Sequence, residues 1–270
     1  MNVLMLCTES PTRIWGGRGK WIQSVPPQLI KRGVGLHLVT WDEQTKDLPY
    51  RFSVPRDRVR VWPTDNDEQK ILLMNQARLV RHCVAMWSKG YRWDLIHAHE
   101  WDMAIPALEL RDLFGTPVVT QFHLFQEQLA EEVATEAKRR NDTDQHPLYC
   151  EAAGWVESDA VITVSENMAH YGKERWGERH VDVILNAVDF ADVRGSDKFV
   201  ADKPIVLYCG RLAEQKGINH FLDAAELDDR YRWGDGQNRC NECRGCGAHT
   251  MDAAHQKDGE APAVQVSRAP

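Results

Sequence analysis

The segment over residues 210–217 carries two cations at a spacing suited to a diphosphate. Arg211 and Lys216 follow an apolar run typical of a buried strand and precede a helical pattern. An arginine can hold phosphate oxygens in a fork while a lysine adds a compact charge, so the pair can stabilise negative charge on a leaving group. We expect this loop to clamp a diphosphate; the alternative is a solvated loop with ordinary surface charges.

A second loop with anion-binding chemistry lies between the first apolar run and the first helical pattern. It contains Gly16, Gly17 and Gly19 around Arg18. Glycines allow backbone amides at a helix N-terminus to approach an anion closely. The backbone amides of Gly17 and Gly19 are therefore candidate hydrogen-bond donors to an anion, although glycines at such a place can also serve only as turn formers.

Histidines and a carboxylate gather at the ends of two later apolar runs. His97, His99, Glu100 and Trp101 close one run, and His123 closes the next. Ligands of open parallel sheets bind beyond the carboxyl ends of the strands, so these side chains are candidates for ligand contact. His97 can instead be a buried histidine bonded to backbone and His123 a structural one. A metal site at His97 and His99 lacks an evident third ligand.

The apolar pattern predicts the elements that must position these residues. Runs at 2–7, 36–41, 94–99, 117–120, 159–164 and 181–185 predict strands, and stretches of helical spacing separate them. This alternation predicts an α/β fold, a Rossmann-like doubly wound parallel sheet covered on both faces. Pro26 and Pro27 lie inside the first helical stretch, so we expect that helix to be kinked or shortened.

The chain divides into three parts by composition. Residues 1–195 form the first domain, and a polar stretch at 190–203 reads as a linker. Residues 203–233 open a second βα unit, with a strand at 204–209 and a helix that carries Ile218 and Phe221. Residues 234–270 contain no Leu, Ile, Phe, Tyr or Trp, which predicts a disordered tail. The alternative for this tail is a zinc site made by Cys240, Cys243, Cys246 and His249.

Charge and hydropathy limit the partners. The chain of 270 residues has 33 basic and 40 acidic side chains, a net charge of -7, and so lacks the basic excess that drives binding to nucleic acid or anionic lipid. No apolar run approaches the roughly 20 residues needed for a membrane span. The first residues lack the features of a signal peptide. We expect a cytoplasmic protein without a nucleic-acid partner.

The motifs occur in an order that resembles one enzyme family. The strand and loop at 206–217 resemble the start of the C-terminal domain of retaining nucleotide-sugar glycosyltransferases with the GT-B fold, in the branch of family 4 and the glycogen and starch synthases. Residues 97–101 resemble a histidine-rich strand end of those synthases, with Glu100 in place of the usual aspartate. Residues 184–189 resemble the segment before the interdomain linker, with Ala187 in place of glycine. The resemblance extends over about residues 1–233.

The resemblance implies transfer of a hexose, glucose above all, from a nucleotide sugar such as UDP-glucose or ADP-glucose to a carbohydrate acceptor hydroxyl, with retention of configuration. It implies no metal and no cofactor. The residues carried over are Gly17, Gly19, Arg211 and Lys216 at the donor diphosphate, His123 with Arg211 and Lys216 as catalytic residues, and His99, Glu100, Trp101 and Asn186 around the acceptor or sugar.

The sequence departs from this family after the second domain begins. Too few residues follow Lys203 for a complete unit of roughly 150 residues, and the family's pair of glutamates is missing. We therefore expect a truncated or frame-shifted chain of weak or no activity. The alternative function is a non-catalytic remnant that binds at most the acceptor sugar. A NAD-dependent dehydrogenase is disfavoured, because the first loop reads GGxG and not GxGxxG.

Overall fold

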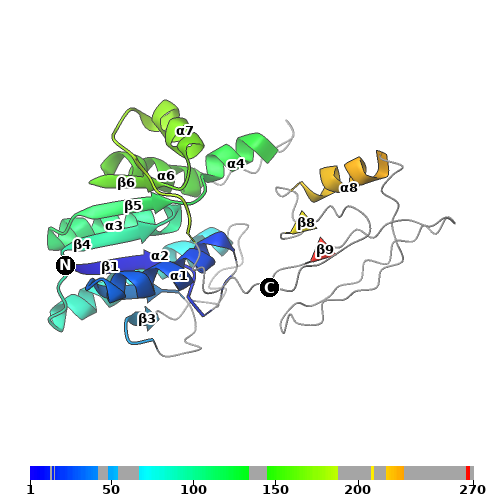
Figure 1. Cartoon of the computed structure of the whole chain (residues 1–270). Coiled ribbons are helices and arrows are strands. Elements are labelled where there is room, and N and C mark those ends of the chain that lie inside the picture. Colours follow the sequence, from blue (N-terminus) through cyan, green and yellow to red (C-terminus); the bar gives the residue numbers. More distant parts are fainter. Residues whose placement is uncertain are drawn as a thin grey trace, which may run out of the picture. The chain divides into compact units, whose positions relative to one another are not determined.

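The computed structural model describes residues 1–12, 14, 16–41, 48–53, 67–133, 145–187, 208–209, 217–227 and 266–267. The chain forms two compact units, Met1–Val193 and Arg194–Pro270, and each is described by itself (Figure 1).

The first unit is built on a seven-stranded sheet in which all neighbouring strands are parallel. The strands are β1 (Asn2–Cys7), β2 (Gly35–Thr40), β3 (Arg51–Ser53), β4 (Leu95–His99), β5 (Val118–Phe122), β6 (Ala160–Thr163) and β7 (Asp182–Val183). Their order is β3-β2-β1-β4-β5-β6-β7. The predicted doubly wound sheet is confirmed, and the sequence order reverses between β1 and β4.

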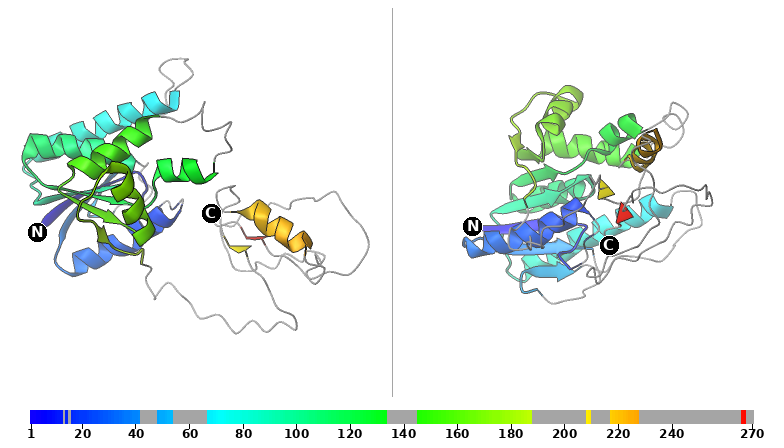
Figure 2. Two further views of the ribbon diagram at one scale, coloured as in Figure 1. Left: turned by 90° about the horizontal axis from the view of Figure 1, so that it is seen from above. Right: turned by 45° about the vertical axis from the view of Figure 1, so that its right-hand side comes forward.

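Helices connect the strands of this sheet. They are α1 (Gly17–Lys31), α2 (Asp67–Ser88), α3 (Trp101–Phe114), α4 (Gln126–Val133), α6 (Gln145–Glu157) and α7 (Glu166–Trp176). Figures 1 and 2 show α1 on one face of the sheet and α2 and α3 on the other. The Oγ of Ser165 accepts a hydrogen bond from the Met168 N–H at 3.2 Å and so caps α7, as expected for a serine before a helix.

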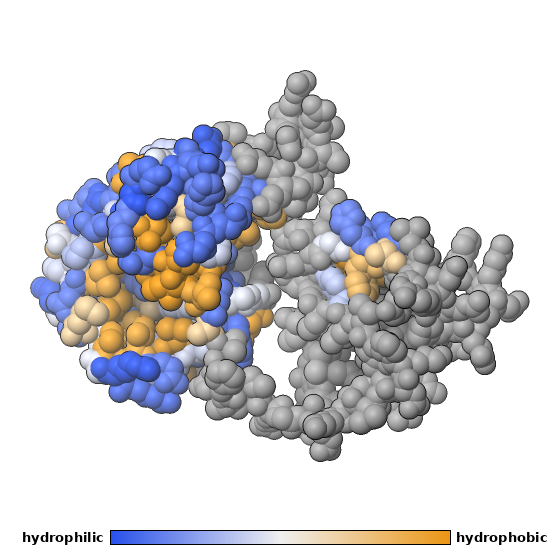
Figure 3. All heavy atoms as spheres, turned by 45° about the horizontal axis from the view of Figure 1, so that its top comes forward, coloured by the Kyte–Doolittle hydropathy of each residue, from blue (hydrophilic) through white to orange (hydrophobic). Residues whose placement is uncertain are grey.

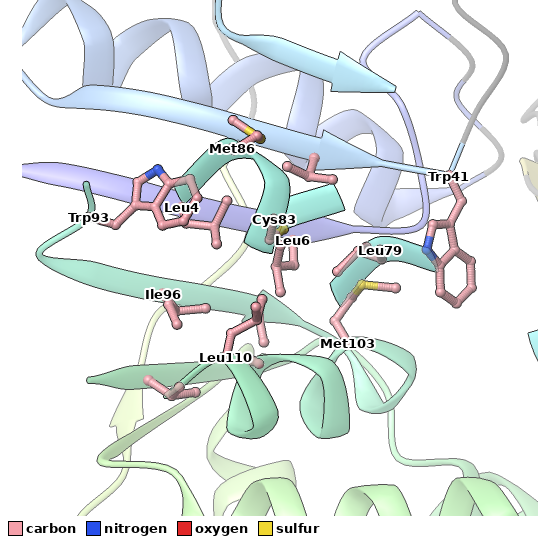
Figure 4. Packing of buried hydrophobic residues seen from close by; sticks show 14 residues of the cluster. Leu4, Leu6, Trp41, Leu79, Cys83, Met86, Trp93, Ile96, Met103 and Leu110 are labelled. Atoms are coloured by element: carbon pink, nitrogen blue, oxygen red, sulfur yellow. The ribbon is translucent and has the colours of Figure 1, made fainter. Parts of the chain in front are cut away.

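Alternation along β1 sends side chains to two separate cores. Leu4 and Leu6 pack with Leu79 of α2 and Leu110 of α3 in the larger core (Figure 4). Their neighbours Val3, Met5 and Cys7 face the other side and pack with the α1 residues Trp21 and Ile22. A strand buried on both faces is the reason why residues 2–7 form a continuous apolar run.

Of the two outcomes expected at Pro26 and Pro27, a kinked or a shortened helix, the structure excludes the second, because α1 runs through both prolines. Pro26 and Pro27 lie inside Gly17–Lys31, and Pro26 is buried. Proline has a backbone angle close to that of a helix, and its cost lies in lost hydrogen bonds and crowding. Burial of Trp21 and Ile22 against β1 and β2 offsets that cost, because tertiary packing supplies most helix stability.

The α1 face of the sheet is covered less completely at β5 and β6. Val119 pairs with His97, and Ile162 pairs with Gln121, so these side chains share one face; Val119 and Ile162 are only half-buried. In Figure 3, apolar atoms gather in the middle of the near side of this unit. Among the residues that the structure describes, no helix covers the face that carries His97 along its whole width.

The second unit contributes three short described elements. They are β8 (Tyr208–Cys209), α8 (Ile218–Leu227) and β9 (Val266–Ser267), and β8 pairs in parallel with β9. β8 falls within the predicted strand at 204–209, and α8 matches the predicted helix. Val266 and Ser267 are strand residues within the tail predicted to be disordered; the rest of that tail, its cysteine cluster and the predicted linker at 190–203 lie outside the described residues.

Candidate functional site

The site lies where the strand order reverses. The loop after β1, the residue after β4 and the residue after β5 all lie at the carboxyl ends of adjacent parallel strands. In open α/β sheets this is the place where ligands bind. The glycine loop, Glu100 and His123 therefore meet at one edge.

Three histidines form a cluster at this edge, defined as His97, His99 and His123. The rings of His97 and His99 lie 4.2 Å apart between centroids, and His99 Nδ1 lies 3.1 Å from His123 Nε2 within hydrogen-bond distance. Trp21 of α1 covers them, with its ring centroid 4.5 Å from that of His99. Adjacent strands β4 and β5 thus bring together residues far apart in sequence.

The histidine cluster is uncharged at neutral pH. Burial lowers the pKa of His97 to about 4 and that of His123 to about 3, with Arg18 also acting on His123. The pKa of His99 is well below its ordinary value, through burial and its two histidine neighbours. A neutral imidazole has one donor and one acceptor nitrogen. Within the described residues, His99 Nε2 is a buried polar atom without a hydrogen-bond partner.

The side chain of Glu100 is bonded to the backbone of His123. Its Oε1 accepts a hydrogen bond from the His123 N–H at 2.7 Å, and its own N–H donates to the Gln121 carbonyl at 2.9 Å. Glu100 has a φ of 74° and is the one non-glycine residue with positive φ in the part of the chain described, a strained conformation that recurs at functional sites. Burial raises its pKa to about 8, against the opposite effect of Arg18. The carboxylate predicted to line the sugar pocket thus holds the backbone of His123.

Arg18 ties the glycine loop to the strand ends. Its Nε lies 3.1 Å from Glu9 Oε1, and its Nη1 lies 3.6 Å from Asp102 Oδ2. Burial acts to lower its pKa, but Asp102 and the other acidic neighbours raise it above the ordinary value. A Cβ on Gly19 would lie 2.3 Å from Glu9 Oε2, so this glycine is required for the close approach of the loop.

The first turn of α1 contains no acidic residue of its own, and Glu9 lies beside it at Arg18 and Gly19. Gly16 is its N-cap and offers no side-chain cap. Gly17 is exposed, and a Cβ placed on it would have no heavy atom within 4 Å. Amide groups at an uncapped helix start favour a negatively charged ligand. Close packing thus accounts for Gly19, and the role predicted for Gly17 stays a prediction.

The other predicted site residues are Asn186, Trp101, Arg211 and Lys216. Asn186 is exposed, and its side chain forms a hydrogen bond with that of His123. Trp101 is the first residue of α3, half-buried, with its ring 6.2 Å from that of His146 on α6. Arg211 and Lys216 lie outside the described residues. The structure therefore brings His99, Glu100, Asn186 and His123 together.

Trp21, Arg18, Asp102 and Gln121 were not among the predicted site residues. Trp21 reads in sequence as a core residue of α1, whereas Asp102 and Gln121 stand within the two candidate strand ends without an assigned role. The one available signal for Arg18 is a cation inside a glycine loop. Within the described ranges, no group of three or more His, Cys, Asp or Glu residues is placed to hold a metal ion. In the same ranges, no helix has the length and apolar character of a membrane span.

Comparison with known proteins identifies the family. Residues 15–192 match the model of Glycosyltransferase Family 4. The chain belongs to glycosyltransferase family 4. It is 30% identical over 261 residues to a glycogen synthase of Mycobacterium tuberculosis strain H37Rv, covering 83% of this chain and 57% of that protein. It is 25% identical over 249 residues to an alpha-maltose-1-phosphate synthase of Mycolicibacterium smegmatis, with the same two coverages of 83% and 57%.

A solved structure supports the fold of this family 4 chain. The sucrose-phosphate synthase of Thermosynechococcus elongatus aligns with a TM-score of 0.68 at 19% identity, over 84% of this chain and 60% of that one. The fold is that of a GT-B glycosyltransferase, with the seven-stranded Rossmann-like sheet as its first half. The chain spans less than two thirds of the length of these relatives.

Proposed function

We propose that this protein is a hexosyltransferase that retains anomeric configuration and transfers a hexose from a nucleotide sugar to a carbohydrate acceptor hydroxyl. The observation that carries the proposal is the neutral histidine cluster under Trp21, placed beside the open first turn of α1 at the strand-order reversal. Glucose is the preferred hexose in this proposal, and UDP-glucose or ADP-glucose the donor. Similarity to a glycogen synthase supports a glucan acceptor.

The roles within this proposal follow from charge and hydrogen bonding. The amide of Gly17 at the start of α1 receives a donor phosphate, and Arg211 and Lys216 neutralise the diphosphate as the glycosidic bond breaks. His123 is the catalytic residue beside the transferred sugar. Its neutral ring, held between His99 and Asn186, can bond to sugar hydroxyls without adding charge. The reaction as proposed uses no metal and no cofactor.

The test is a transfer assay with the purified chain. The chain is incubated with UDP-glucose or ADP-glucose and a maltooligosaccharide, and both released nucleotide and hexose incorporated into the acceptor are measured. We expect His123→Ala to lower transfer at least about a hundredfold, a loss typical for one catalytic contact. His170→Ala is the control, because His170 is exposed on α7. Transfer that survives His123→Ala would contradict the assigned role. No transfer by the unmodified chain, with binding of the glucan retained, would favour the alternative of a non-catalytic remnant.

A further inference from the structure

Helix α4 begins three residues after His123, and no neighbouring side chain caps its start. It starts at Gln126, and the carbonyl of Phe125 accepts the first helical hydrogen bond from Leu129 at 3.0 Å. Phe125 therefore occupies the position where Ser, Thr, Asp or Asn usually supplies a side-chain acceptor. Its ring is fully buried against Phe122 and Trp155 instead. The first N–H groups of α4 need an acceptor from elsewhere.

Glu151 of α6 supplies that acceptor from a distant part of the sequence. Its Oε1 accepts a hydrogen bond from the Gln126 N–H at 2.5 Å, and its Oε2 one from the Glu127 N–H at 3.4 Å. Glu151 is fully buried, and both of its oxygens are directed to a helix N-terminus, where negative charge is favoured. Arg175 forms an ion pair with the side chain of Glu127 at 2.7 Å.

The turn that carries His123 is thus held at both ends by buried glutamate side chains. Glu100 accepts from the N–H of His123, and Glu151 accepts from the N–H of Gln126, with two residues between them. We propose that Glu151 is a positioning residue, which fixes the turn between β5 and α4 and so holds the His123 imidazole against His99. This proposal rests on the role of His123 given under the proposed function.

A role in general stability accounts less well for this arrangement. A fully buried carboxylate costs more free energy than an apolar side chain in the same space, and a serine at position 125 would cap α4 locally. Burial raises the pKa of Glu151 to about 7, and the two amide hydrogen bonds act in the opposite direction. Glu151 is buried at this cost next to the turn that presents His123. The same site contains Glu100, whose ionisation Glu151 disfavours.

The test compares the full chain with Glu151→Gln at pH 8, where Glu151 is mainly ionised. The carboxamide keeps one acceptor oxygen and turns its NH₂ group toward the second amide, so one of the two hydrogen bonds is lost. Hydrogen exchange at the Gln126 and Glu127 amides is measured by NMR together with the ring ¹⁵N resonances of His123. We expect exchange about ten- to a hundredfold faster, as for loss of a hydrogen bond to a charged group, and a displaced His123 ring resonance. Glu151→Asp keeps the charge on a shorter side chain, and we expect it to restore part of both signals.

Glu157→Gln is the matched control, because Glu157 lies on the same helix, is 53% exposed and contacts Arg111. Unchanged amide exchange and an unchanged His123 ring in Glu151→Gln would overturn the proposal. Equal changes in the Glu157→Gln control would do the same, because they would show a general effect on α6. Both readouts are made without ligand, so a failure of sugar transfer by the unmodified chain would count against the proposed function alone.

Discussion

The buried carboxyl of Glu100 gives the first unit a stability that falls as pH rises. Burial raises the pKa of Glu100 from its ordinary value of 4.5 to about 8. Between these two values the folded chain keeps a proton that the unfolded chain has lost, so the free energy of unfolding decreases with increasing pH. One proton corresponds to about 1.4 kcal/mol per pH unit inside this window. From pH 6 to pH 8.5 the loss due to Glu100 is therefore about 2 to 3 kcal/mol.

Glu100→Gln removes this ionisation and keeps an acceptor oxygen for the His123 N–H. At pH 6 the carboxyl is protonated, and its carbonyl oxygen accepts the hydrogen bond as an amide oxygen does. Because the unfolded chain has already lost the Glu100 proton at pH 6, the variant gains stability over the unmodified chain at both pH values. We expect this gain to be about 2 to 3 kcal/mol larger at pH 8.5 than at pH 6. Urea unfolding followed by tryptophan fluorescence at both pH values measures the difference.

Glu157→Gln controls for the charge change, because this carboxylate is half exposed. A Glu100→Gln variant that is less stable than the unmodified chain at pH 8.5 by the same margin as at pH 6 would refute the reasoning. It would mean that Glu100 is ionised throughout and stabilises the turn as a charge.

Other variants and conditions test further parts of the structure. Gly172→Ala is expected to lower stability by about 1 to 3 kcal/mol, measured by thermal unfolding, since a Cβ there would lie 2.3 Å from the buried Trp155 ring. Leu79→Ala removes a fully buried side chain from the larger core and should cost about 2 to 5 kcal/mol in urea unfolding; a loss under 1 kcal/mol would contradict the packing. The rings of the histidine cluster, with pKa values lowered by burial, should stay largely neutral down to about pH 5 in an NMR pH titration, and ring protonation near pH 6.5 would show that they are solvated. Gly19→Ala places a Cβ against Glu9 and should lower stability in urea unfolding more than Gly17→Ala, whose Cβ would meet no heavy atom within 4 Å; equal losses would contradict the packing role of Gly19.

Most of the first unit could be predicted from sequence, because its strands are buried on both faces. Residues 2–7 stand out as an apolar run for that reason, and β1 has the predicted bounds. β3 was not predicted, because Arg51–Ser53 is a three-residue edge strand without an apolar run. Local rules at Pro26 and Pro27 predict a kinked or shortened helix, but α1 is not shortened, since those rules do not include the packing of Trp21 onto the sheet.

The site could be predicted in part. Strand ends in a parallel sheet indicate His99 and His123 separately, but their contact depends on the register of β4 with β5. The side-chain direction of Glu100 depends on a positive φ that no sequence pattern predicts. Glu151 reads as an ordinary helix glutamate, because its partners are backbone amides of another helix.

The most direct measurement of the central claim is the response of the histidine rings to ligand. Ring resonances are recorded by NMR while UDP-glucose or ADP-glucose and a maltooligosaccharide are added to the full chain. If the site beyond β4 and β5 binds the transferred sugar, the resonances of His99 and His123 shift on saturation. Those of His37, which packs with Phe52 and Tyr91 elsewhere in the sheet, stay in place. Shifts at His37 with none at His99 and His123 would contradict the account.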